Sequence, residues 1–155
     1  MKEQEIIRKI DIALDLFYEK DKYLIEKNVH ERSIAHKFAE YLQLLFPDYN
    51  LGCEYDKHGE YTKELEDIKE CDEDKKTNRI LSDIVIHHRG HDRNNLVVFE
   101  IKSKSEATAC DIRKLELLTK ESGQFRYRLG VFVLFGDERP ECELKLFING
   151  MQSEI

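Results

Sequence analysis

The sequence lacks long hydrophobic runs. No stretch approaches the roughly 18 consecutive apolar residues that indicate a membrane-spanning helix. The start of the chain, MKEQEIIRKI, carries charges where a signal peptide would have its apolar core. We therefore expect a soluble, cytoplasmic protein with no membrane partner.

The chain also lacks an excess of positive charge. It has 25 Lys and Arg against 32 Asp and Glu, a formal net charge of -7, which argues against a protein that coats nucleic acid through bulk positive charge. Residues 60–76 contain eight acidic side chains and four lysines, so this segment alone contributes -4 and the remainder -3. We expect a charged, solvated insertion there, and any polyanion must be bound at a local site.

Closely spaced cysteines are absent as well. The four cysteines, at positions 53, 71, 110 and 142, form no CxxC pair, so we expect reduced thiols and no disulfide framework. A zinc site is disfavoured because His87 and His88 are neighbours, which point to opposite faces of a strand, and the histidine spacing matches no common zinc motif.

Hydrophobic residues make up 41% of the 155 residues, enough for one core in a chain of this length. We therefore expect a single domain over residues 1–155. Apolar residues at intervals of three and four predict helices over residues 4–26, from Asn28 as the N-cap to Pro47, and over residues 106–122.

Runs rich in β-branched and aromatic residues predict the strands. They cover residues 49–55, 80–88, 95–102, 129–135 and 143–148. Residues 89–94 form the turn of a hairpin between the second and third strands. Two helices, three strands, one helix and two strands indicate an α/β protein with a mixed sheet flanked by helices.

Three charged residues interrupt two apolar strands of this hairpin: Asp83, Glu100 and Lys102. A register that places Val85 opposite Val98 places Asp83 opposite Glu100, with Lys102 on the same face. Opposed residues have β-carbons about 5 Å apart, and two carboxylates at that distance destabilise a sheet unless a cation lies between them. Mg²⁺ or Mn²⁺ suits such hard oxygen ligands, and Lys102 could partly neutralise the pair itself.

A further acidic residue, Glu31, lies on the apolar stripe of the second predicted helix, three and four residues before Ile34 and Ala35. A core-facing glutamate is uncommon and indicates a functional role. Its place in the first turn, where a carboxylate interacts favourably with the helix dipole, explains it equally well.

These residues together resemble the PD-(D/E)XK nuclease superfamily, with its restriction-endonuclease-like fold. The resemblance rests on the helix motif ER-x-x-x-H at Glu31, the strand SDIVIHHRG and the strand VVFEIK. Within the superfamily, the chain is similar to small stand-alone prokaryotic members. It implies an αβββαβ core from about Val29 to Phe135, with an extra N-terminal helix and a C-terminal strand as peripheral additions. Ser82 stands where the family has proline.

The resemblance implies roles for the site residues. Asp83, Glu100 and the main-chain carbonyl of Ile101 would bind Mg²⁺ or Mn²⁺, with Glu31 supporting the metal directly or through water. Lys102 would orient or help to deprotonate the attacking water. These roles imply a metal-dependent endonuclease that hydrolyses phosphodiester bonds of DNA, or of RNA.

Phosphate contacts are expected from a further set of basic residues: His87, Arg113, Lys114 and Lys120. A solvated helix face also explains the charges on the last predicted helix. The expected partners are nucleic acid, with DNA favoured over RNA, and either a second copy of the chain or a partner protein. Two other readings stay open: an inactive nuclease-like module that binds nucleic acid or protein, and a buried ion-pair network without function.

Overall fold

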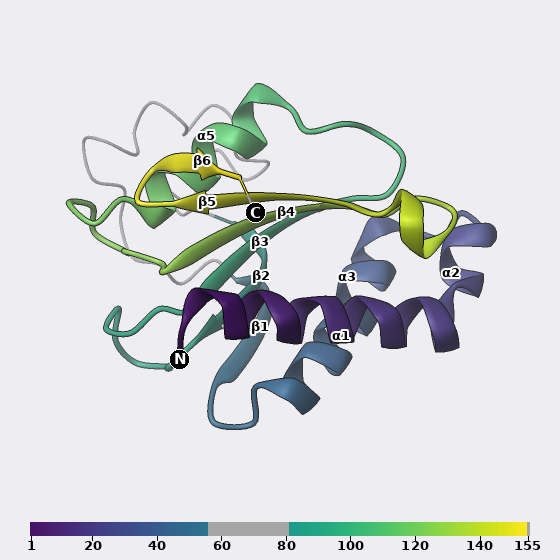
Figure 1. The fold of residues 1–155 in the computed structure, drawn as a ribbon, viewed down its shortest axis with the longest axis horizontal. Coiled ribbons are helices and arrows are strands. Elements are labelled where there is room, and N and C mark those ends of the chain that lie inside the picture. The colour runs from purple at the N-terminus through teal and green to yellow at the C-terminus, as the bar shows by residue number, and fades with distance from the viewer. Residues whose placement is uncertain (56–80, 155) are drawn as a thin grey trace.

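The computed structural model describes residues 1–55 and 81–154 of the chain (Figure 1). The helices are α1 (Glu3–Asp21), α2 (Tyr23–Glu26), α3 (Glu31–Leu45) and α5 (Ala109–Thr119), with a 3-10 turn η2 (Arg139–Glu141). The strands are β1 (Asn50–Tyr55), β2 (Ser82–His87), β3 (Val97–Lys102), β4 (Leu129–Leu134), β5 (Glu143–Ile148) and β6 (Met151–Ser153). The predicted insertion at 60–76 lies outside the described residues. Within them, no helix is long and apolar enough to cross a membrane.

The strands form one mixed sheet in the order β1-β2-β3-β4-β5-β6. All neighbours are antiparallel except β3 and β4, which are parallel and are joined through α5. Parallel neighbours require such a crossover, because a tight turn cannot return the chain to the same end of the sheet. The structure thus confirms the prediction of an α/β protein with a mixed sheet flanked by helices.

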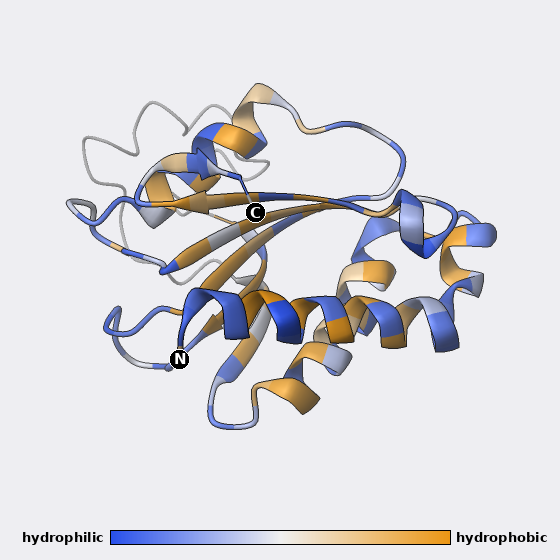
Figure 2. Cartoon of the chain, viewed as in Figure 1, coloured by the Kyte–Doolittle hydropathy of each residue, from blue (hydrophilic) through white to orange (hydrophobic). Residues whose placement is uncertain are grey.

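Helices cover both faces of the sheet (Figure 1). α1 and α3 pack on one face, where Phe17, Phe38 and Phe99 are fully buried in the larger core cluster. α5 packs on the other face, where Leu115 and Leu118 meet Val85, Val98 and Phe132 in a second cluster. Figure 2 shows the hydrophobic residues of the helices and strands concentrated between these layers.

The two ends of the chain differ from the sequence-based expectation. The first predicted helix is interrupted at Lys22 into α1 and α2. α1, the additional N-terminal helix, buries Ile6, Ile10 and Phe17 in the hydrophobic core. The last predicted strand, β5, is followed by a further strand, β6, which pairs with it and forms the edge of the sheet.

The N-cap of α3 also differs from the prediction. Asn28 has a φ of 56° and lies before the helix, in the left-handed region that Asn tolerates better than most residues. His30 is the N-cap, and its Nδ1 accepts a hydrogen bond from the backbone N–H of Arg32 at 3.4 Å. α3 therefore begins at Glu31, which places this carboxylate at the helix N-terminus.

The cysteines follow the expectation only in part. Cys142 is a free thiol, and burial raises its pKa to about 11. Cys110, in the first turn of α5, is disulfide-bonded, so the expectation of reduced thiols is wrong for this residue. Cys71 lies outside the described residues.

Candidate functional site

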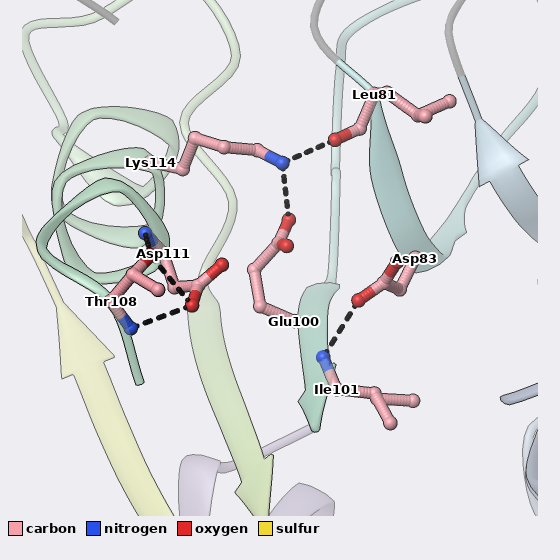
Figure 3. A network of polar contacts seen from close by, with 7 residues as sticks. All are labelled: Leu81, Asp83, Glu100, Ile101, Thr108, Asp111 and Lys114. Atoms are coloured by element: carbon pink, nitrogen blue, oxygen red, sulfur yellow. Dashed lines mark hydrogen bonds and ion pairs between the residues drawn. The ribbon is translucent and has the colours of Figure 1, made fainter. Parts of the chain in front are cut away.

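The register of β2 and β3 brings the first two candidate residues together. Ile84 pairs with Phe99 and Val85 with Val98, so the next position along the ladder has Asp83 opposite Glu100. This confirms the register that the apolar pattern predicts. Oδ2 of Asp83 accepts a hydrogen bond from the backbone N–H of Ile101 at 2.7 Å (Figure 3), which holds the aspartate against the end of β3.

Glu100 is buried beneath α5 with only 4% of its surface exposed. Nζ of Lys114 lies 2.9 Å from Oε1 of Glu100 and also donates a hydrogen bond to the carbonyl of Leu81 (Figure 3). The contact with Glu100 is an ion pair without hydrogen-bond angles, and Oε1 has no hydrogen-bond partner among the described residues. A buried carboxylate oxygen in this state is costly, because burial removes the water that would solvate it.

A capping box fixes the start of α5 beside this pair. Oγ1 of Thr108 accepts a hydrogen bond from the backbone N–H of Asp111 at 3.2 Å, and Oδ2 of Asp111 accepts one from the backbone N–H of Thr108 at 2.8 Å. Lys114 follows Asp111 by three residues, so both lie on the same side of the helix. The capping box therefore positions Lys114 over Glu100 (Figure 3).

Burial dominates the electrostatics of both carboxyl groups. It raises the pKa of Glu100 to about 8 despite the attraction of Lys114, and the charges of Asp83 and Asp111 raise it further. Burial also raises the pKa of Asp83, against the Ile101 N–H and the charges of Lys114 and Lys102. Both groups therefore hold their protons more strongly than exposed carboxyl groups, and additional positive charge at this site would favour their ionised forms.

Glu31 lies at the same end of the sheet but does not contact the carboxylate pair. Its Oε2 accepts a hydrogen bond from the backbone N–H of Ser103 at 2.7 Å, directly after Lys102 at the end of β3. Lys102 is partly exposed. Among residues 1–55 and 81–154, no group of three or more His, Cys, Asp or Glu side chains could hold a metal ion. A metal here would depend on Asp83, Glu100 and main-chain oxygen.

The four predicted phosphate contacts do not converge on one surface. Lys114 is 8% exposed and paired with Glu100, so its ammonium faces the carboxylate and not the surface. His87 is 3% exposed, and burial lowers its pKa, so it does not present a charge to a substrate at the surface either. Both side chains are buried, and their burial depends on tertiary packing that a one-dimensional pattern does not show.

The other two predicted contacts lie on the outside of α5. Arg113 is exposed and forms an ion pair with Glu116 at 3.6 Å. Lys120 follows the last residue of α5, and its side chain packs against Gly150 of the β5–β6 turn. Because α5 runs back along the sheet from the end of β3 to the start of β4, Lys120 lies at the end of the sheet opposite to Lys102.

Sequence reasoning missed the structural roles of Asp111 and Lys114. The spacing of Thr108 and Asp111 fits a capping box, and Lys114 lies three and four residues before the buried Leu117 and Leu118. Those two signals could have indicated that Lys114 faces the sheet.

Comparison with known proteins gives no match: no family model, no curated protein and no solved structure matches the chain. We therefore infer the function from the geometry and chemistry of the site.

Proposed function

We propose that the protein is a metal-dependent phosphodiesterase that hydrolyses DNA or RNA, with a PD-(D/E)XK-type site. The observation that carries this proposal is the register of β2 and β3: Ile84 pairs with Phe99, so Asp83 and Glu100 occupy the next position on the two strands. Lys102 lies on the same face of β3 as Glu100. The order of elements from α3 to β4 agrees with the αβββαβ core that the sequence resemblance implies.

The residues fit a divalent cation. Asp83 and Glu100 offer carboxylate oxygens, the ligands that Mg²⁺ and Mn²⁺ prefer. Oε1 of Glu100 already lies 2.9 Å from the ammonium of Lys114, so a positive charge is accommodated at this position. The main-chain carbonyl of Ile101 completes the proposed ligand set, with Glu31 in support. When bound, the metal supplies charge for the phosphoryl oxygens and lowers the pKa of a bound water.

The other residues of the site would position the attacking water and the end of β3, and they neutralise part of the carboxylate charge. Lys102 provides a fixed positive charge beside the carboxylates, where it would orient the attacking water and stabilise negative charge on the phosphoryl group. Glu31 holds the backbone at Ser103 and so fixes the end of β3 that carries Lys102. Lys114 limits repulsion between Asp83 and Glu100 through its ion pair with Glu100.

The ion pair also supports the second candidate function, an inactive nuclease-like module that binds nucleic acid or a partner protein. Lys114 already places one positive charge 2.9 Å from Glu100, so the cluster has a cation of its own. In this case Asp83, Glu100 and Lys114 form a structural network. Replacing such a network by apolar residues often costs little, whereas removing one member is destabilising.

The experiment combines metal binding and hydrolysis. Calorimetry with Mn²⁺ should detect binding by the wild type and its loss in Asp83→Asn. Assays with Mg²⁺ or Mn²⁺ on single- and double-stranded DNA and on RNA should show cleavage that Lys102→Ala lowers at least tenfold. Lys104→Ala removes an exposed lysine two residues further on and should cleave like the wild type. Intact substrates with wild type and Lys102→Ala alike would contradict the nuclease function.

Lys114→Met separates the two candidates. If a metal binds at the carboxylates, removal of the neighbouring ammonium should tighten Mn²⁺ binding, because like charges repel. If the cluster is only structural, Lys114→Met should lower stability and Mn²⁺ should bind to neither protein. Thermal unfolding of both proteins with and without Mn²⁺ reports both effects.

A further inference from the structure

A pocket of about 500 Å³ lies at the other end of the β2–β3 hairpin. Its walls come from the segment before β1, the turn after β2 and the segment before β4. The lining residues with groups that can contact a ligand include Tyr49, His88, Arg93, Asn95, Arg126 and Arg128. From Asp83 to His88 is five residues of extended chain, about 16 Å at the rise of a β-strand, so the pocket is separate from the carboxylate site.

The pocket concentrates positive charge in an acidic protein. Three arginines line it against one carboxylate, Asp92, whereas the whole chain has a net charge of -7. Arg128 is paired with Glu3 at 3.2 Å, and both side chains are more than 40% exposed, so a stronger anion can compete for this arginine. Guanidinium groups bind phosphate through paired, charge-assisted hydrogen bonds.

The same pocket has an aromatic wall and a hydrogen-bonding group. The rings of Tyr49 and His88 are stacked, with centroids 4.7 Å apart and planes at 23°. Asn95 is 3% exposed, its Nδ2 donates to the carbonyl of Phe125 at 2.8 Å, and its Oδ1 has no hydrogen-bond partner in the described part of the chain. These groups suit a planar, polar ring in addition to an anion.

Backbone strain lies at the rim of the pocket. Asn94 and Arg126, two of its lining residues, have φ values of 60° and 47°. Left-handed backbone is unfavourable for a side chain such as arginine and occurs often at ligand sites, where the surrounding structure maintains it. Arg126 thus combines this backbone conformation with a place in the pocket lining.

We propose that this pocket binds one nucleotide unit, with its phosphate on the arginines and its base against the Tyr49–His88 wall. The unit is either a free nucleotide or the phosphorylated end of a nucleic-acid strand. The proposal does not depend on hydrolysis at Asp83 and Glu100, and its test uses no divalent metal.

The test is calorimetry of the full chain with four probes: adenosine 5′-monophosphate, adenosine, inorganic phosphate and a short single-stranded oligonucleotide with a 5′-phosphate. We expect phosphate-bearing probes to bind and adenosine to bind at least tenfold more weakly than its monophosphate. Preference for the monophosphate identifies a free nucleotide as the ligand, and preference for the oligonucleotide identifies a strand end. If neither the monophosphate nor the oligonucleotide binds, the proposal is overturned.

Two variants locate the binding and one serves as a control. Arg126→Gln should weaken every phosphate-bearing probe at least tenfold, whereas Lys20→Gln, which removes one exposed charge at the end of α1, should leave affinity unchanged. Tyr49→Leu should weaken the monophosphate but not inorganic phosphate. Equal affinities for Arg126→Gln and Lys20→Gln would overturn the assignment.

Nuclear magnetic resonance on the wild type keeps the test independent of the stability of the variants. Addition of the monophosphate should shift the backbone amide signals of Tyr49, His88 and Asn95 more than those of Asp83 and Glu100. The reverse pattern would place the ligand at the carboxylate site and overturn the proposal.

Discussion

The two faces of the β2–β3 hairpin differ in what they bury. On the face covered by α1 and α3, Ile84, Phe99 and Ile101 belong to an apolar cluster that continues to the ends of the strands. On the face covered by α5, Val85 and Val98 are apolar, but the next pair is Asp83 and Glu100. Because strand side chains alternate, one pair of strands can stabilise the fold on one face and hold buried charges on the other.

The first prediction tests the apolar face and has the largest expected effect on stability. Phe99 is fully buried, and its ring meets that of Phe38 edge-on with centroids 5.9 Å apart. Phe99→Ala should lower the free energy of unfolding by about 3–5 kcal/mol through lost burial and a cavity, measured by chemical denaturation. Leu44→Ala is the control, because Leu44 is 71% exposed, and its effect should be small. Equal losses would show that the apolar face does not carry the stability.

The second prediction tests the charged face through pH. The pKa of Glu100 is about 8 in the folded protein and near 4.5 ordinarily. The folded state therefore binds more protons than the unfolded state between these values, so the free energy of unfolding should fall as pH rises. The slope cannot exceed about 1.4 kcal/mol per pH unit for one proton. Denaturation curves recorded between pH 6.5 and 8 in metal-free buffer measure this slope.

Glu100→Gln is the matched variant for this slope, since it retains the shape of the side chain and cannot ionise. It should flatten the pH dependence between pH 6.5 and 8. His87 contributes outside this window: its lowered pKa gives stability that is lost as pH falls below 6.5. An unchanged slope in Glu100→Gln would show that Glu100 does not hold its proton in the folded protein.

The third prediction has the smallest effect and concerns the boundary between the two faces. Glu31→Gln weakens the hydrogen bond to the Ser103 N–H, because a neutral amide oxygen replaces a carboxylate. The loss should be about 1 kcal/mol, measured by denaturation. Glu40→Gln, an exposed residue on the same helix, should change stability less. Unchanged stability in Glu31→Gln would show that the contact at Ser103 contributes nothing.

Much of the hairpin was predictable from the sequence. The alternation of apolar residues in β2 and β3 predicted the register with Val85 opposite Val98, and continuing that register places Asp83 opposite Glu100. The strand order along the chain and the helix between β3 and β4 followed from the change of hydrophobic period.

Other parts of the site were not predictable, for a physical reason in each case. Lys114 looked like a surface charge because the periodicity of α5 does not report which long side chain reaches back over the sheet. The pocket at His88 joins residues from three separate segments, and no local pattern links Tyr49 to Arg126. Strand β6 has three residues, too few for an alternation to be recognised.

Local sequence thus determined the elements, the alternation within the strands and the pairing of two carboxylates, because these depend on residues that are neighbours in the chain or in one hairpin. Only the tertiary structure decided that Lys114 lies beside Glu100 and that Glu31 contacts the end of β3. It also decided that three arginines line one pocket. Those outcomes depend on how α3, α5 and the turns pack on the sheet, where burial and distance are set by contacts between residues far apart in sequence.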